Sequence, residues 1–214
     1  FQSVRFLMTK DIKLIVVACN TASALAMEEA QKAFDIPIIG VIEPGSKAAV
    51  YATKNSTIGI IGTEGTINSG SYQRRIRKML PSAEIIGLSC PLFVPIVEEG
   101  WENSDVAFIT AQKYLLELKE HNIDSLVLGC THYPALRYTI NKVFENKVKL
   151  VNPAYETAKA TKIMLKENNM LSEKLDGGKT SFFVSDDPEK FKRIGGNILR
   201  KEITPVQKVN IENL

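Results

Sequence analysis

The sequence predicts an α/β fold built mostly from parallel strands. Short apolar runs of strand length alternate with longer stretches of helical periodicity along most of the 214 residues. This alternation is typical of parallel sheets with helices on both faces. The first run, residues 14–18, is continuously apolar, which favours a strand buried on both faces. In addition, one strand-and-cysteine pattern occurs twice along the chain, which indicates two similar α/β units.

The first half of the chain contains three helical stretches, each lying between two strands. Residues 22–34 are rich in Ala, Glu and Met, and their apolar positions recur at helical spacing. Residues 45–53 and 69–79 have the same kind of spacing. The short apolar runs around these helices predict strands at 14–18, 38–42, 57–61 and 85–88.

The second half continues the alternation, with clearer signals at the helix boundaries. Ser104 precedes a long periodic stretch at 105–121 and is expected to be its N-cap. Asp187-Pro188-Glu189 marks the start of a helix near the C-terminus. The remaining elements are expected as strands at 126–128, 148–151, after Thr180 and at 206–209, and as helices at 135–144 and 155–167.

Composition and charge exclude several classes of protein. With 24% charged and 44% hydrophobic residues, the chain is not a disordered polypeptide, a collagen-like repeat or a coiled coil. Its longest purely apolar run, residues 14–19, is far shorter than the roughly 20 residues of a bilayer span, so no membrane partner is expected. The net charge is only +3, and we interpret the one basic cluster, residues 74–78, as a solvated helix face. No nucleic-acid partner is therefore expected.

The three cysteines, Cys19, Cys90 and Cys130, are too few and too widely spaced for a disulfide framework or a zinc site. The sequence therefore predicts a reduced, cytoplasmic protein without a metal. The N-terminal residues do not have the pattern of a signal peptide. Because the chain does not begin with Met and starts within an expected helix, we expect it to be a fragment of a longer protein.

Cys19 and Cys130 lie in an internal repeat. Residues 11–21 align with residues 122–132, and in both copies an Ile precedes a run of apolar residues, one small residue and then the cysteine. Each thiol is therefore expected at the carboxyl end of a parallel strand, which is the edge at which open α/β sheets bind ligands.

The surroundings of these two cysteines favour chemistry over simple packing. A lone cysteine after a buried strand is most often a small core hydrophobe, and we interpret Cys90 in this way. Cys19 and Cys130 are instead flanked by polar groups that would be costly to bury unpaired. These groups belong to Asn20, Thr21 and Ser23 on one side and to Thr131, His132 and Tyr133 on the other.

Two thiols can serve as an acid and a base at neutral pH, because the pKa of a free thiol is about 8.5. If they faced each other across one carbon atom, one thiolate could remove a proton while the opposite thiol supplied another. Such a pair would invert a stereocentre. A redox dithiol is disfavoured, because neither cysteine belongs to a Cys-x-x-Cys motif.

Two motifs carry a resemblance to a known family. Ala18-Cys19-Asn20-Thr21-Ala22-Ser23 and the stretch from Leu128 to Pro134, Leu-Gly-Cys-Thr-His-Tyr-Pro, resemble the two signature motifs of the aspartate/glutamate racemase family. Residues 60–67 and 90–98 are also similar to that family in content and order, so the resemblance runs from about residue 12 to the C-terminus. The His-Tyr-Pro after the second cysteine resembles the glutamate racemases more than the aspartate racemases.

The resemblance implies racemisation of L-glutamate and D-glutamate without a cofactor. It makes Cys19 the acid/base that acts on D-glutamate and Cys130 the one that acts on L-glutamate. His132 would assist proton transfer at Cys130, and Glu98 would act in catalysis or organise the pocket. The residues implied to bind the substrate are Asn20, Thr21, Thr63, Thr66, Thr131 and His132.

The resemblance also implies two pseudo-symmetric α/β domains with the active site in the cleft between them. We expect a discontinuous first domain, residues 1–43 and 152–214, and an inserted second domain, residues 44–151, each supplying one thiol. The family further implies a homodimer and a role in supplying D-glutamate for cell-wall peptidoglycan.

The family's opening strand, its Gly-rich turn with an Asp-Ser pair and its Pro-Tyr-Gly segment have no counterpart in this sequence. We therefore expect one sheet to lack its opening strand, and the fragment can be inactive as it stands. Three alternatives stay open: a racemase of another amino acid, above all aspartate; a cysteine hydrolase with a single nucleophile; and a non-catalytic binding module of the same fold.

Overall fold

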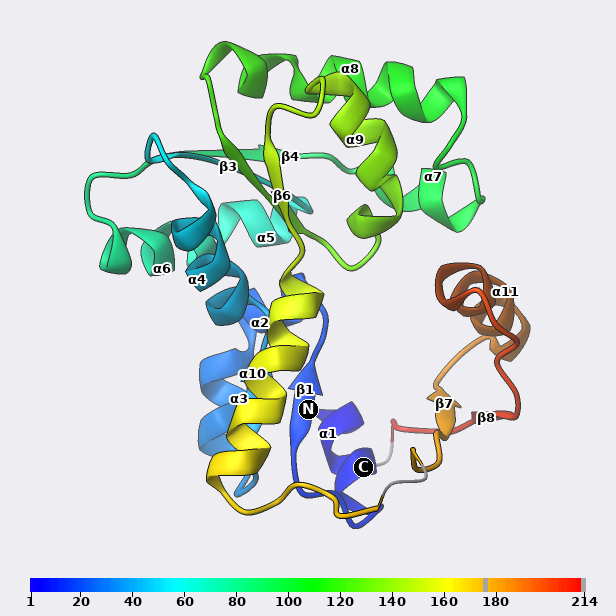
Figure 1. The fold of residues 1–214 in the computed structure, drawn as a ribbon. Helices are drawn as coiled ribbons and strands as arrows, with labels where there is room; N and C mark the ends of the chain where they lie inside the picture. The colour runs from blue at the N-terminus through cyan, green and yellow to red at the C-terminus, as the bar shows by residue number, and fades with distance from the viewer. Residues whose placement is uncertain (175–176, 213–214) are drawn as a thin grey trace.

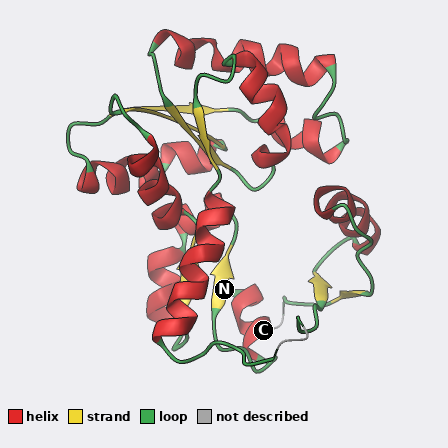
Figure 2. Ribbon diagram, in the orientation of Figure 1, coloured by secondary structure: helices red, strands yellow, loops and turns green. Residues whose placement is uncertain are grey.

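The computed structural model describes residues 1–174 and 177–212, and all the strands in them pair in parallel. Figures 1 and 2 show a central sheet, a small sheet near the N-terminus and another in the C-terminal segment. The α/β fold with parallel sheets is therefore confirmed. The strand order is β4 (Glu84–Ser89), β3 (Thr57–Gly62), β5 (Ser125–Gly129), β6 (Lys149–Val151) in the central sheet, with β1 (Ile15–Val17) beside β2 (Ile38–Gly40) and β7 (Phe182–Val184) beside β8 (Val206–Lys208).

Helices cover both faces of the central sheet. Successive side chains of a strand point to opposite faces, so each strand contributes to two cores. On β5, Leu126 and Leu128 pack into the core formed with α7 (Phe93–Glu98), α8 (Asp105–Glu120) and α9 (Arg137–Val143). Val127 between them packs into a second core, with α4 (Ile42–Ala52) and α6 (Ser71–Met79). Figure 1 shows these two layers above and below the sheet.

The β1–β2 sheet has a smaller core than the central sheet. Its buried members are Ile15, Ala30 and Ile38, and the nearby helices are α1 (Gln2–Met8), α2 (Asn20–Leu25), α3 (Met27–Ala33) and α10 (Pro153–Glu167). The expectation that residues 14–18 are buried on both faces is wrong, because Val16 is 42% exposed. In a sheet of two strands that packs its core on the face of Ile15, the alternating side chain of Val16 points to solvent.

Two helices expected as continuous are divided in the structure. Residues 22–34 divide at Ala26, where φ is −124°. Residues 135–144 begin in the 3₁₀ turn η1 (Tyr133–Leu136) before α9. The helix expected at 69–79 is present as α6, but the separate helix α5 (Glu64–Asn68), which Gly70 at a φ of 63° joins to α6, was missed. The sequence analysis also missed α7, whose Pro95 is accommodated because it lies in the first turn.

The predicted helix caps at two other sites are confirmed. The Ser104 hydroxyl accepts a hydrogen bond from the Ala107 amide at the start of α8. The Asp187 carboxylate accepts from the amides of Glu189 and Lys190 at the start of α11 (Pro188–Leu199).

The predicted boundary between the two domains, at residues 43 and 44, lies in the first turn of α4. This helix begins at Ile42 and packs against α6 and α10, so the expected first domain (1–43 and 152–214) and second domain (44–151) would meet along it. The boundaries stay a prediction.

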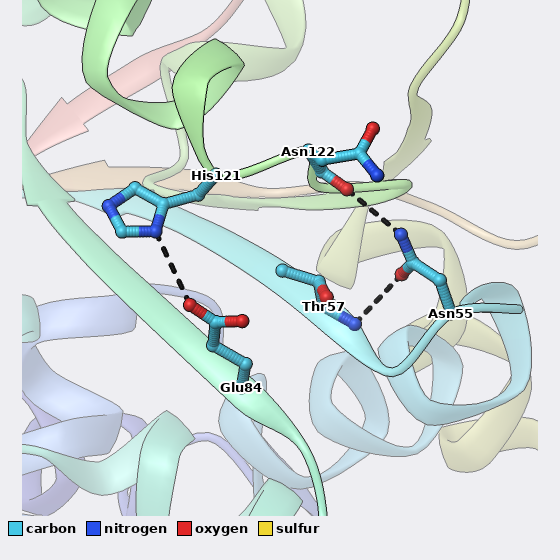
Figure 3. A network of polar contacts seen from close by, with 5 residues as sticks. All are labelled: Asn55, Thr57, Glu84, His121 and Asn122. Carbon is cyan, nitrogen blue, oxygen red and sulfur yellow. Dashed lines mark hydrogen bonds and ion pairs between the residues drawn. The ribbon is translucent and has the colours of Figure 1, made fainter.

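A polar network joins the amino ends of the central strands, opposite the cysteines (Figure 3). The side-chain amide of Asn55 makes two hydrogen bonds of 2.9 Å. Its nitrogen donates to the backbone carbonyl of Asn122, and its oxygen accepts from the backbone N–H of Thr57. His121, at the end of α8, lies 3.3 Å from the Glu84 carboxylate at the start of β4. These contacts fix the strand starts and leave the carboxyl ends free to form a site.

Asp124 strengthens the same edge and makes the stability of the fold depend on pH. Burial raises the pKa of this carboxyl, but hydrogen bonds from the Thr53 hydroxyl and from the amides of Lys54 and Asn55 outweigh burial and lower it. A carboxyl with a lowered folded-state pKa stabilises the protein above its unfolded pKa of about 3.9, and that contribution is lost as the pH falls through the folded value.

Asp124→Asn is therefore expected to lower the free energy of unfolding at pH 7 by about 1–3 kcal/mol. The asparagine side chain would place an NH₂ group, which cannot accept a hydrogen bond, against hydroxyl and amide groups that donate. Urea unfolding across pH 3–7 measures the difference between variant and parent, which we expect to shrink on the acid side. Asp35→Asn, the same change at an exposed carboxylate, is the control. A difference that stays constant with pH would contradict the role given to the Asp124 charge.

Candidate functional site

Cys19 lies where β1 ends and α2 begins. Its sulfur accepts a hydrogen bond from the Ala22 amide at 3.5 Å and so caps the helix. The residue is exposed, and it follows a parallel strand as the repeat predicts. Helix N-termini stabilise negative charge, so this position suits a sulfur that becomes a thiolate.

Cys130 follows β5 in the same way but is only 8% exposed. Burial raises the pKa of its thiol, while the backbone N–H groups of Thr131, His132 and Tyr133 oppose that rise. The electrostatic effect of Cys19 raises the pKa of Cys130 further. The two thiols differ in solvation, because Cys19 is exposed and Cys130 is buried.

The two halves of the repeat are in contact through a threonine side chain of the second motif. The Thr131 hydroxyl donates to the carbonyl of Ala18, next to Cys19, at 3.1 Å. A Cβ at Gly129 would lie only 2.6 Å from the Ile61 carbonyl oxygen, so only glycine fits where the chain leaves β5 for Cys130. The two cysteine segments, far apart in sequence, are thus in direct contact.

Three threonine hydroxyls form a triangle beside Cys19. Thr21 lies 2.8 Å from Thr63 and 3.2 Å from Thr66, and Thr63 lies 3.1 Å from Thr66. Thr63 follows β3 and caps α5 by accepting a hydrogen bond from the Thr66 amide. Hydroxyl groups and the free amides of a helix start are donors suited to a carboxylate.

Asn20 is held in place from the interior. Asn20 is only 4% exposed, and its side-chain oxygen accepts a hydrogen bond from the buried Tyr72 hydroxyl at 2.7 Å. Ser23 ties the same turn to the sheet, because its hydroxyl donates to the Val17 carbonyl and accepts from the Val41 amide. The Cys19 turn is therefore rigidly supported from behind.

On the other side, His132 lies between the thiol of Cys130 and the carboxylate of Glu98. Its Nδ1 is 3.9 Å from the Cys130 sulfur, and its Nε2 is 3.5 Å from Oε1 of Glu98. A carboxylate at Nε2 favours the tautomer that carries the proton there, which leaves the Nδ1 lone pair facing the thiol. The ring can then accept a proton from Cys130.

Tyr133 fixes the loop that carries His132. Its side chain is fully buried, and its hydroxyl lies 3.0 Å from the Gly62 carbonyl oxygen and 2.8 Å from that of Cys90. Cys90 itself is completely buried, as expected for a core residue, and burial raises its pKa to about 12.

The structure places the predicted site residues in two groups around the two cysteines. One group surrounds Cys19 and consists of Asn20, Thr21, Thr63 and Thr66; the other surrounds Cys130 and consists of Glu98, Thr131 and His132. Sequence reasoning missed Tyr72, whose hydroxyl positions Asn20, and Lys190, whose ammonium lies 3.0 Å from Glu98. No local motif marks either residue.

Within residues 1–174 and 177–212, no group of three or more His, Cys, Asp or Glu side chains is arranged to hold a metal ion. Across the same described ranges, no helix has the length and apolar character needed to cross a membrane.

Comparison with known proteins gives sequence and fold similarity over most of the chain. A family model described as Asp/Glu/Hydantoin racemase matches residues 2–161. A glutamate racemase of Geobacter metallireducens is 45% identical over 207 residues, which are 97% of this chain and 77% of that protein.

Two crystal structures are similar to the fold described above. Glutamate racemase isoform RacE1 of Bacillus anthracis has a TM-score of 0.93 and 36% identity, over 98% of this chain and 78% of that chain. Glutamate racemase of Francisella tularensis, in complex with D-glutamate, has a TM-score of 0.92 and 34% identity, over 100% of this chain and 79% of that chain.

Proposed function

The chain belongs to the Asp/Glu/Hydantoin racemase family, and from that premise we propose that it interconverts L-glutamate and D-glutamate by two-base inversion at Cα. One cysteine, as the thiolate, removes the α-proton, and the thiol of the other cysteine protonates the opposite face. After each turnover the thiol and thiolate have exchanged roles, so atoms and charges balance without a cofactor.

The observation that carries this proposal is the contact between the two cysteine segments. Cys19 and Cys130 follow two different parallel strands, and the Thr131–Ala18 hydrogen bond joins the segments that carry them. Both cysteines are free. Two thiols that interact electrostatically suit a reaction that needs a base and an acid together.

The threonine triangle of Thr21, Thr63 and Thr66 suits a carboxylate of the substrate. Donors fixed before the substrate arrives stabilise the negative charge that develops when the α-proton leaves. Asn20 and Thr131 lie beside the two cysteines and are proposed to complete the binding site. The choice of glutamate rests on the relatives, which are glutamate racemases.

On the Cys130 side, we assign His132 the role of assisting proton transfer and Glu98 the role of orienting His132. Their distances to Cys130 and to each other allow both roles. By the family resemblance, Cys130 acts on L-glutamate and Cys19 on D-glutamate.

The wider role follows from the product. D-Glutamate made in the cytoplasm would supply peptidoglycan synthesis, and the family resemblance implies a homodimer. Sedimentation of the purified chain measures directly whether it forms a homodimer.

The deciding experiment is deuterium exchange at Cα, followed by proton NMR in D₂O with each enantiomer of glutamate. Exchange with both enantiomers is expected. Exchange with aspartate but not glutamate would point to the other substrate. Glutamate binding without exchange would instead identify a binding module and overturn the proposal.

A further inference from the structure

Glu98 is held by α11 as well as by His132. The Lys190 ammonium lies 3.0 Å from Oε2 of Glu98, and the Arg193 guanidinium donates to the backbone carbonyl of Glu98 at 3.1 Å. Figure 1 shows α11, in the C-terminal segment, on the side of the molecule where α7 lies. The two contacts therefore fix α11 to the end of α7 that carries Glu98.

The two oxygens of the Glu98 carboxylate have different partners. Oε1 lies 3.5 Å from Nε2 of His132, and Oε2 contacts Lys190. The side chains of His132 and Glu98 are 25% and 27% exposed, whereas that of Lys190 is 53% exposed. Because the carboxylate is planar, a cation at one oxygen restricts the direction in which the other oxygen points.

We propose that Lys190 is a positioning residue of the site: it keeps the Glu98 carboxylate turned toward His132, and so acts on Cys130 through these two side chains. The hydrogen bond from Lys190 lowers the pKa of Glu98 more than burial raises it, and the charges of Lys190 and His132 add to the lowering. Arg193, on the same helix, is the other cation that contacts Glu98.

This inference rests on the proposed function for its meaning in catalysis. The Glu98 carboxylate accepts a hydrogen bond from the Nε2–H of His132 and leaves Nδ1 free to accept the proton of Cys130. Without Lys190, the carboxylate is free to turn away from Nε2, and that arrangement of the ring loses its support. The C-terminal helix α11 thus acts on the thiol of the second motif without touching the substrate.

The test measures the titration of Glu98 by carboxyl ¹³C NMR on the full chain labelled at glutamate, with the resonance identified by its loss in Glu98→Gln. Lys190→Met is expected to raise the pKa of Glu98 by about 0.3–0.7 unit, the range of a partly exposed ion pair. Lys190→Arg should restore the parent value. The chain has only 2 histidines, so the shift that Lys190→Met causes in this titration step should appear in the ring signals of His132 and not in those of His121, whose carboxylate partner is Glu84.

Lys192→Met is the matched control. It removes the same charge from the same helix, but Lys192 pairs with Glu189, so the Glu98 titration should stay unchanged. An equal Glu98 titration in Lys190→Met and the parent, or a step absent from the His132 signals, would overturn the proposal. Because neither readout uses racemase activity, loss of the proposed function would show separately, in the exchange assay.

Discussion

Cys130→Ser is expected to abolish deuterium incorporation into L-glutamate while D-glutamate still exchanges, and Cys19→Ser is expected to do the reverse. The serine hydroxyl is a far weaker acid than a thiol, so each variant loses the base on one face of Cα. The remaining cysteine can still remove a proton and return a deuteron on its own face. The loss should be about 10²–10⁴-fold, the usual contribution of a general acid or base.

The measurement is the initial rate of loss of the Cα proton signal in D₂O, taken separately for each enantiomer and each variant. Cys90→Ala is the control, because Cys90 is a buried core cysteine outside the proposed machinery. Equal loss for both enantiomers in only one of the two serine variants would indicate a single nucleophile, and the two-base mechanism would be wrong.

Strand-and-helix alternation was enough to predict the fold class and most element positions. The expected strands at 57–61, 85–88, 126–128 and 148–151 correspond to β3, β4, β5 and β6. Boundaries set by local chemistry, such as the caps at Ser104 and Asp187, were also predictable. The division at Ala26 was not, because a single backbone torsion divides a stretch whose periodicity is continuous.

For the site as well, features set by a local motif were predictable and contacts between distant elements were not. The repeat placed Cys19 and Cys130 at strand ends because a motif of about ten residues carries that information. The contact between Lys190 and Glu98 joins α11 to α7, and the contact between Tyr72 and Asn20 joins α6 to α2. Such pairings depend on how helices pack, so no spacing in the sequence predicts them.

The exposed face of β1 shows how tertiary context changes a local pattern. A continuously apolar run favours burial on both faces, yet Val16 is 42% exposed because its sheet has two strands and packs on one side. The apolar pattern predicted the strand correctly but predicted wrongly that both of its faces are buried.

Tyr133→Ala is expected to lower the free energy of unfolding by about 3–5 kcal/mol, the range for removing a buried aromatic side chain. Tyr133 is fully buried and packs edge-on against Phe93, with ring centroids 5.3 Å apart. Tyr133→Phe keeps the ring and removes only the hydroxyl, while the carbonyls of Gly62 and Cys90 keep the amides of Cys90 and Phe93 as donors. That variant should cost about 0.5–1.5 kcal/mol, the net contribution of one hydrogen bond.

Urea unfolding of the two variants separates the contribution of the ring from that of the hydroxyl. Tyr138→Ala and Tyr138→Phe are the controls, because Tyr138 lies on the neighbouring helix α9 and is 61% exposed; both should stay within about 0.5 kcal/mol of the parent. If Tyr133→Phe were as stable as the parent, the hydroxyl would not be what holds the loop of Cys130 and His132 to the sheet. If it is destabilised as expected, exchange at Cα should fall as well, because the same loop carries both groups of the second motif that we propose to transfer protons.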